Sequence, residues 1–343
     1  MTSNRQIRAS RGAGFTLVEM LVVIVIIGML AGLTTTVLVS ARRSVRNSVV
    51  ASEEVQLSIA LDQYKNKVGE YPPDLSDPSA VMRHIKKRWP RYNVTYDQFI
   101  QHVQDGCKLS SGSYAGPISD LTELNGQHVW QLGNYVSSLV FWLGGLPNAD
   151  GIPSGFYANP KAPLGIDANN NPIRKPYRAT REKPFYSFDR KSLASFWFDD
   201  SGADPIYYPA DDAALWSDSL GAYLYVPAVC EGGYPILYFR PTIGSGYADK
   251  YVFFGETAAD SVSQAVPYAR DAAQGSWYEE RRFQLVHPGA DGLFGQSVAE
   301  GGRSLGPVGT QPTFNVTLAD DDNITNFLQE GTLQSEYRDV NGN

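Results

Sequence analysis

A single carboxylate, Glu19, stands inside the most apolar stretch of the chain, Gly14–Val39. Apart from Glu19 this stretch carries no charge, and Met20–Leu33 consists only of apolar residues and glycine. A carboxylate in a membrane segment costs on the order of a few kcal/mol, so by default it serves a function and needs a partner. A cut after Gly14 would supply one, because Phe15 would then carry an α-amino cation about one helical turn from Glu19. The amine could pair with Glu19 of its own chain or of a neighbouring subunit.

The other polar residues form no recognised catalytic pattern. The histidines are scattered and lack the H-E-x-x-H spacing of zinc hydrolases. The chain has no G-x-S-x-G elbow, no P-loop and no G-x-G-x-x-G after a predicted strand. Asp167–Asn171 has the opening spacing of an EF-hand loop, but Pro172 stands where glycine is needed and Arg178 where a bidentate glutamate belongs. We therefore expect a protein that is not an enzyme. The four histidines are His84, His102, His128 and His287.

The chain has two cysteines, Cys107 and Cys230. If the body of the protein is extracytoplasmic, a disulfide between them is possible, because disulfides form in oxidising compartments. The sequence does not show whether the two residues are close together. A disulfide and two unpaired thiols are therefore both left open.

The element that carries Glu19 is a predicted N-terminal helix. Residues 15–39 span roughly 37 Å as a helix, enough to cross a bilayer core of about 30 Å. A fully buried helix of a soluble domain is the alternative. Ser40–Val68 contains no glycine or proline and has an apolar stripe at helical spacing, with Leu57, Leu61 and Tyr64 among its members. We expect one helix over residues 15–68, ended by Gly69, with two helices and a break near residues 34–40 as the alternative.

The rest of the chain reads as a mixed globular body, residues 69–343. Helices are predicted at Ala80–Arg88, Tyr96–Val103 and Leu121–Leu143, and an elaborated loop at Ile152–Arg190. Short aromatic or β-branched runs bounded by turn residues predict strands. We expect an α+β fold, in which a small antiparallel sheet lies on the amphipathic half of the long helix, with helical and loop insertions. The predicted strands are Leu193–Phe198, Tyr223–Val229, Tyr234–Arg240 and Tyr251–Phe254.

Composition excludes some classes of function. The 343-residue chain has 43% hydrophobic and 19% charged residues, which is typical of a globular protein and not of a disordered one. The net charge is −7, and three of the positive charges lie in residues 1–14, which contain no acid; residues 15–343 therefore carry −10. A duplex-binding domain is normally basic, so we expect no nucleic-acid partner.

The N-terminus resembles the prepilin processing site of type IV pilins and of type II secretion pseudopilins. The resemblance rests on a basic leader, Gly14, and then Phe15-Thr-Leu-Val-Glu19 followed by an apolar helix. It implies cleavage between Gly14 and Phe15 by a membrane prepilin peptidase, with residues 1–14 as the leader, and N-methylation of Phe15. It further implies that Glu19 acts in assembly when the helix packs into a filament core. The globular body, residues 69–343, would lie in the periplasm, beyond a single inner-membrane span.

Three further passages resemble the major pseudopilin of type II secretion. The first is Ala60–Pro73, which contains A-L-D-Q-Y-K and G-E-Y-P-P, and the second, a looser one, is Gly233–Phe239. The third is Gly289-Ala-Asp291-Gly followed, after an insertion, by Asp320-Asp-Asp-Asn323-Ile-Thr-Asn326-Phe.

In that family the C-terminal loop holds calcium, so the resemblance implies a Ca²⁺ site made by Asp291 with Asp321 or Asp322. Asp320 and Asn323 are weaker candidates. Calcium takes six to eight oxygen ligands, and successive aspartates repel one another unless a cation or solvent screens them. A solvated acidic loop without metal is the alternative.

The leading hypothesis is a structural pseudopilin with an enlarged head. Its partners would be prepilin peptidase, other pseudopilins and the inner-membrane secretion platform. Two alternatives stay open: a type IV pilus or DNA-uptake pilin, and a membrane-tethered extracytoplasmic binding protein.

Overall fold

The computed structural model of the chain describes residues 16–111, 134–148, 151–173, 179–194, 196–199, 206–209, 224–230, 233–243, 246–247, 252–254, 263–271, 276–289, 292, 294 and 323–327. The chain forms two compact units, Met1–Val45 and Arg46–Asn343. The second unit, residues 46–343, is called the head below.

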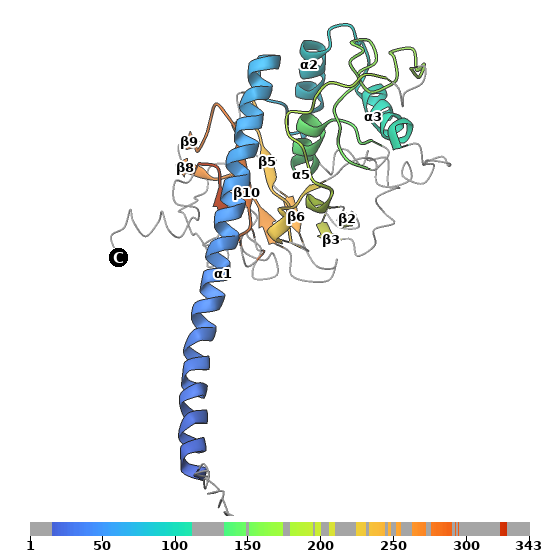
Figure 1. Ribbon diagram of the computed structural model, residues 1–343. Coiled ribbons are helices and arrows are strands. Elements are labelled where there is room, and N and C mark those ends of the chain that lie inside the picture. Colours follow the sequence, from blue (N-terminus) through green and yellow to red (C-terminus); the bar gives the residue numbers. More distant parts are fainter. Residues whose placement is uncertain are drawn as a thin grey trace, which may run out of the picture. The chain divides into compact units, whose positions relative to one another are not determined.

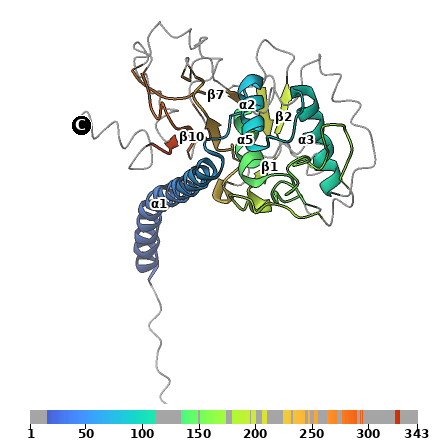
Figure 2. The same cartoon turned by 90° about the horizontal axis from the view of Figure 1, so that it is seen from above.

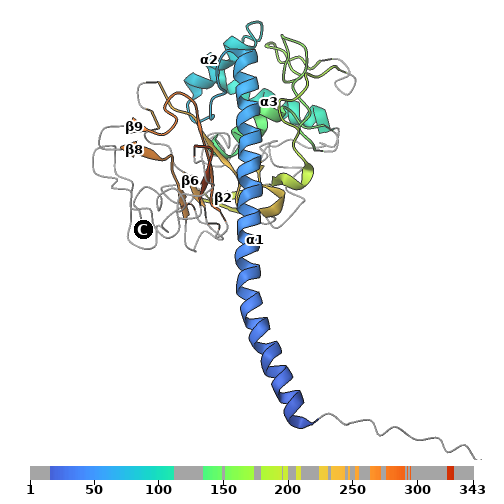
Figure 3. The same ribbon diagram turned by 60° about the vertical axis from the view of Figure 1, so that its left-hand side comes forward.

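The helix α1 runs from Leu17 to Val68 as one element of 52 residues (Figure 1; Figure 3). The predicted single helix is therefore confirmed over the described residues, and the alternative break near residues 34–40 is absent from α1. The helix ends as predicted at Gly69, whose φ of +90° is left-handed and whose N–H donates to the carbonyl of Lys65 at 2.6 Å. Glycine adopts this conformation without the steric cost that a Cβ would bring.

Three more α-helices lie in the described part of the head, and local signals explain where two of them start. Helix α2 (Pro78–Arg88) begins at Asp77, whose carboxylate accepts a hydrogen bond from the Ser79 N–H at 2.8 Å. In front of α3 (Tyr96–Ser111), Thr95 and Gln98 exchange side-chain to backbone hydrogen bonds in a capping box. The third helix, α5 (Asn134–Leu139), continues into the π-helical turn η2 (Val140–Gly144). Two of the predicted helices are confirmed; the first part of the predicted Leu121–Leu143 lies outside the described residues.

Eleven short strands are described, and they form four small sheets. The sheet β11-β10-β5 is antiparallel throughout, as are the pairs β1-β4 and β8-β9. The sheet β2-β3-β6-β7 contains one parallel pair, β3 with β6. The strands are β1 (Leu193–Ala194), β2 (Phe196–Asp199), β3 (Ile206–Pro209), β4 (Leu224–Tyr225), β5 (Leu237–Phe239), β6 (Val252–Phe254), β7 (Ser263–Ala265), β8 (Ala269–Asp271), β9 (Ser276–Trp277), β10 (Gln284–His287) and β11 (Ile324–Thr325).

The expected α+β architecture with an antiparallel sheet is thus present at a coarse level, but its details differ. The predicted strand Leu193–Phe198 is divided into β1 and β2, and Tyr223–Val229 is a strand only at β4 before it turns into the 3₁₀ helix η5 (Ala228–Cys230). The parallel pairing of β3 and β6 was not predicted. Strand partners are chosen by contacts between distant segments, which no local pattern specifies.

The antiparallel sheet packs on the amphipathic half of α1, as predicted. Leu57, Leu61 and Tyr64 of α1 belong to one buried cluster with Tyr238 of β5 and Leu285 of β10. Figure 1 shows β5 and β10 beside this part of the helix. The α1 stripe that was recognised by its spacing is therefore the face that docks on the sheet.

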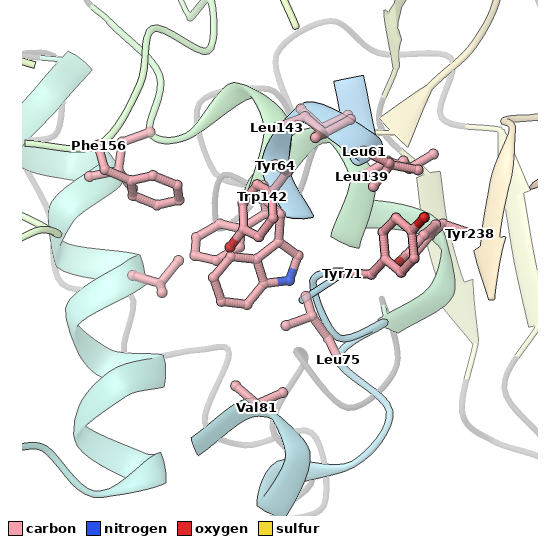
Figure 4. Packing of buried hydrophobic residues seen from close by; sticks show 14 of the residues in the cluster. Leu61, Tyr64, Tyr71, Leu75, Val81, Leu139, Trp142, Leu143, Phe156 and Tyr238 are labelled. Carbon is pink, nitrogen blue, oxygen red and sulfur yellow. The ribbon is translucent and has the colours of Figure 1, made fainter. Parts of the chain in front are cut away.

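Aromatic side chains dominate the main core. Trp142 of η2 is fully buried and lies edge-on to the ring of His84, with the centroids 4.9 Å apart. Phe156 and Tyr64 approach the same indole with centroid distances of 6.5 Å and 6.4 Å (Figure 4). Seen from above, α2, α3 and α5 gather on one side of the head and β10 lies on the other (Figure 2). The core thus joins the helical side of the head to α1.

Candidate functional site

The predicted processing site lies at the edge of the described chain. Gly14 and Phe15 are outside the described residues, and the structure begins at Thr16, directly before α1. Glu19, in the first turn of α1, is described and exposed. The geometry available for this site is therefore that of Thr16 and Glu19.

Thr16 and Glu19 form a reciprocal capping box at the start of α1. One carboxylate oxygen of Glu19, Oε2, accepts hydrogen bonds from the N–H and the hydroxyl of Thr16, both at 2.8 Å. In return, the N–H of Glu19 donates to Oγ1 of Thr16 at 3.2 Å. This arrangement satisfies backbone donors that have no partner inside the helix. Glu19 therefore has a local role in this chain besides the pairing with the Phe15 amine that was predicted.

The sequence carries a signal for this contact that the sequence analysis did not use. Threonine followed three residues later by glutamate, just before an apolar run, is the signature of a capping box. Thr16 is hence the residue at this end of the helix that reasoning from charge alone missed.

Apolar side chains on the N-terminal part of α1 are exposed around the helix. Their exposed fractions run from 43% at Val23 to 81% at Leu17. Among the described residues, no helix meets the length and apolarity that a membrane crossing requires. The span over residues 15–39 stays a prediction. The exposed residues are Leu17, Val18, Met20, Leu21, Val22, Val23, Ile24, Val25, Ile26, Ile27, Met29 and Leu30.

The predicted calcium ligands Asp291, Asp321 and Asp322, like Asp320, lie outside the described residues. Within the described part of the chain, no group of three or more His, Cys, Asp or Glu side chains is arranged to hold a metal. Asn323 is fully buried, and its Nδ2 donates to the Tyr268 hydroxyl at 2.7 Å and to the Phe294 carbonyl at 3.1 Å. This weaker candidate thus ties its strand to neighbouring segments.

The two parts of the predicted calcium loop start from paired strands. His287 of β10 and Ile324 of β11 are directly opposite each other in the antiparallel ladder. Asp291 follows His287 by four residues, and Asp322 precedes Ile324 by two. The pairing therefore brings the strand ends on either side of the loop to one place.

Cys230 is a buried free thiol, and its Sγ accepts a hydrogen bond from Nε of Arg46 at 3.1 Å. Burial raises the pKa of this thiol, while the Arg46 guanidinium acts in the opposite direction. The side chain of Cys107 lies outside what the structure describes. The pairing of the two cysteines is not tested and stays a prediction.

A Glu–His–Tyr chain joins the end of α1 to α2. The Tyr64 hydroxyl lies 2.7 Å from Nε2 of His84, whose Nδ1 lies 2.6 Å from Oε1 of Glu70. Burial lowers the pKa of His84 to about 4, and the hydrogen bond from His84 is the main cause that lowers the pKa of Glu70 to about 2. A neutral imidazole therefore donates from Nδ1 to the Glu70 carboxylate and accepts from Tyr64 at Nε2.

The Glu70–His84–Tyr64 hydrogen-bond chain has the residue types of a relay that activates a nucleophile, but its tyrosine is not accessible to a substrate. Tyr64 is fully buried, and burial raises its pKa to about 12. Its oxygen already accepts a hydrogen bond from Arg88 at 2.7 Å. The group therefore connects α1, the turn after it and α2 through satisfied hydrogen bonds. The sequence analysis did not find it, because its members are up to 24 residues apart and share no motif.

Comparison with known proteins identifies one part of the chain. Residues 10–35 match the family model described as the prokaryotic N-terminal methylation motif. The chain therefore carries a type IV prepilin-like signal, which indicates a pilin-like or pseudopilin substrate of prepilin peptidase and suggests membrane anchoring. No curated protein and no solved structure matches the chain.

Proposed function

We propose that this chain is a structural filament subunit, a pseudopilin of a type II secretion system with an enlarged head. The observation that carries the proposal is the match of residues 10–35 to the N-terminal methylation motif. The exposed apolar side chains on the first part of α1 support it, because such a surface needs lipid or other helices around it.

The proposed mechanism is polymerisation and involves no catalysis by this chain. Prepilin peptidase cleaves between Gly14 and Phe15, and Phe15 is N-methylated. The mature chain is anchored by residues 15–39 in the inner membrane, with its head in the periplasm. During assembly on the inner-membrane secretion platform, Glu19 compensates the Phe15 amine of a neighbouring pseudopilin. This pairing lowers the cost of placing both charges among apolar helices.

The first test is the intact mass and N-terminal sequence of the protein purified from its native membrane. A chain that begins at N-methylated Phe15 is expected. A chain that still begins at Met1, in cells that process other prepilins, would overturn the proposal. The tethered binding protein would then be the better account.

The kind of filament needs a second experiment. Deleting the secretion ATPase is expected to abolish the assembly of this subunit, whereas deleting a pilus ATPase in the same cells is expected to leave it unchanged. The reverse result would assign the chain to a type IV pilus or DNA-uptake system. Glu19→Ala is expected to abolish assembly in either system and to leave a mere tether functional.

We also propose that the loop between β10 and β11 binds Ca²⁺ through Asp291 with Asp321 or Asp322. The antiparallel pairing of His287 with Ile324 supports this, because it holds the two ends of the loop together. Carboxylates and the carbonyls of glycine-rich turns are the oxygen ligands that calcium prefers. Gly289 and Gly292, on either side of Asp291, both have left-handed φ angles, +67° and +77°.

Calcium binding is tested by thermal unfolding of the full chain with CaCl₂, with MgCl₂ and with EDTA. Calcium alone is expected to raise Tm, since a ligand at 100 times its Kd stabilises by about 2.7 kcal/mol. Asp291→Ala and Asp322→Ala are expected to remove this shift. Asp97→Ala, at an exposed position on α3, is the control and should retain it. Equal Tm values with calcium and EDTA in the unsubstituted chain would contradict the proposal.

A further inference from the structure

Glu54 of α1 is a buried carboxyl group without a hydrogen-bond partner. Its side chain is 1% exposed, and neither Oε1 nor Oε2 has a partner. Buried polar groups in folded proteins are nearly always paired, so such an exception calls for an explanation. Glu54 also lies outside the groups that the proposed filament function uses.

Glu54 lies among the apolar residues with which α1 contacts the head. Val50, Glu54, Leu57 and Leu61 follow one another at helical spacing on the face of α1 that packs on the sheet. Val50 belongs to a buried cluster with Ile324 of β11, and Leu57 belongs to the main core cluster. Glu54 therefore occupies a core position between two apolar contacts of α1 with the head.

Other unpartnered polar atoms share this interface. Oδ1 of Asn47 and Oγ of Ser58 are buried without a partner, and both residues lie on the Glu54 side of α1, seven residues before and four residues after it. His287 and Leu285 are two residues apart on β10 and therefore lie on the same face of the strand, the face that packs on α1. Nε2 of His287 has no hydrogen-bond partner either. Asn47, Glu54, Ser58 and His287 are called the polar seam below.

The charged and titratable groups around the seam are engaged elsewhere. On α1, Arg46 donates to Cys230 of η5. Glu53 accepts from the Tyr225 hydroxyl of β4 at 2.9 Å, and the Tyr238 hydroxyl of β5 donates to the Pro72 carbonyl at 2.7 Å.

His287 accepts a hydrogen bond at Nδ1 from the Gly289 N–H at 3.1 Å, so the proton of its neutral ring is on Nε2. Burial, followed by the charge of Arg46, lowers its pKa to about 3. Burial alone raises the pKa of Glu54 well above 4.5, with no charged group contributing. Glu54 thus adds no charge to the described interface only while it keeps its proton.

We propose that the polar seam is a proton-sensitive latch between α1 and the sheet β5-β10-β11, closed while Glu54 is protonated and opened when Glu54 ionises. Ionisation places an uncompensated carboxylate in an apolar interface, and the carboxylate reaches water only if the helix face separates from the strands. The latch concerns how α1 docks within the head. It does not depend on the identity of the filament.

The test is amide hydrogen exchange of the full chain in detergent micelles, compared at equal pH between the natural chain and Glu54→Gln. Equal pH cancels the intrinsic pH dependence of exchange. The opening equilibrium of residues 47–58 and of β10 and β11 is expected to rise about tenfold per pH unit in the natural chain above the ordinary Glu value, until Glu54 ionises in the closed state. It is expected to stay flat in Glu54→Gln. The ratio of the opening equilibria of the two chains should grow at least tenfold between pH 5 and pH 8.

Two controls make the result specific to the latch. Glu53→Gln removes a carboxylate from the same turn, leaves Glu54 in place and is expected to keep the steep response. Glu54→Leu replaces Glu54→Gln in the experiment if the glutamine variant does not fold. Its opening equilibrium is likewise expected not to change with pH. Equal exchange of the natural chain and the Glu54 variants at pH 5 and pH 8 would overturn the proposal, as would a pH response confined to segments outside the seam.

Discussion

The Tyr64 hydroxyl on α1 lies 2.7 Å from Nε2 of His84 on α2, and the same oxygen accepts a hydrogen bond from Arg88. The two rings are stacked with their centroids 5.7 Å apart, beside the buried indole of Trp142. Hydrogen bonds and aromatic packing therefore fix the end of α1 to the next helix at one place.

Tyr64→Phe is expected to destabilise the head by about 1–3 kcal/mol, because it leaves His84 Nε2 and one Arg88 donor without a partner in a buried site. Urea unfolding followed by tryptophan fluorescence measures this, since Trp142 and Trp89 lie in the same core. Tyr96→Phe removes a partly buried hydroxyl from α3 and should change stability by less than about 0.5 kcal/mol. Equal losses in the two variants would contradict the role of the network.

Acid is expected to weaken the head through His84. Its folded-state pKa of about 4 is below the ordinary 6.5. Its contribution to the unfolding free energy is therefore complete above pH 6.5 and is lost as pH falls from 6.5 through 4. Glu70, lowered to about 2 from 4.5, loses its contribution only below pH 4.5. At pH 5 the unfolding free energy lost through His84, relative to neutral pH, is about 2 kcal/mol.

Because Glu54 acts in the opposite direction, the measurement for His84 is a difference between two chains. The unfolding free energy of the natural chain minus that of His84→Gln should fall between pH 7 and pH 5. A constant difference over this range would show that His84 titrates normally in the folded state.

The capping box predicts separate roles for Thr16 and Glu19. Thr16→Val removes the hydroxyl that bonds the carboxylate and is expected to weaken the helix start by about 1 kcal/mol. Filament yield in cells should therefore fall partially, whereas Glu19→Ala should abolish it. Thr16→Ser keeps the hydroxyl and should behave as the natural chain. A normal yield from Thr16→Val would show that the cap has no part in assembly.

Two left-handed glycines of the head are expected to respond differently to alanine. At Gly155 (φ +92°) a Cβ would come within 1.8 Å of the Glu182 carbonyl oxygen, which belongs to the backbone and can shift only at a high cost. At Gly69 (φ +90°) it would meet only the flexible end of the Lys87 side chain, at 3.3 Å. Gly69→Ala should therefore cost about 1–3 kcal/mol of backbone strain, and Gly155→Ala should prevent soluble folding or cost clearly more. Thermal unfolding of the two variants measures the contrast, and equal Tm values would contradict it.

The local features of this protein follow from the sequence by itself. The apolar stretch, the spacing of Leu57, Leu61 and Tyr64, and Gly69 are sufficient to predict α1 and its end. Each is a relation among residues within a few turns of one another. The residues of the predicted processing site, Gly14–Glu19, are equally close together in the sequence, and they lie within residues 10–35, which match the N-terminal methylation motif. The capping box of Thr16 and Glu19 was predictable in the same way, although it was missed.

Only the tertiary structure decided which distant groups meet. It paired β3 with β6 in parallel, assembled Tyr64, His84 and Glu70 into one network, and enclosed Glu54 in the interface with the sheet. Within a few helical turns of sequence, Glu54 is one more charged residue on an amphipathic helix. Its burial depends on strands more than 180 residues away in the chain. The physical consequence of that burial, a carboxyl group cut off from water, exists only in the folded head.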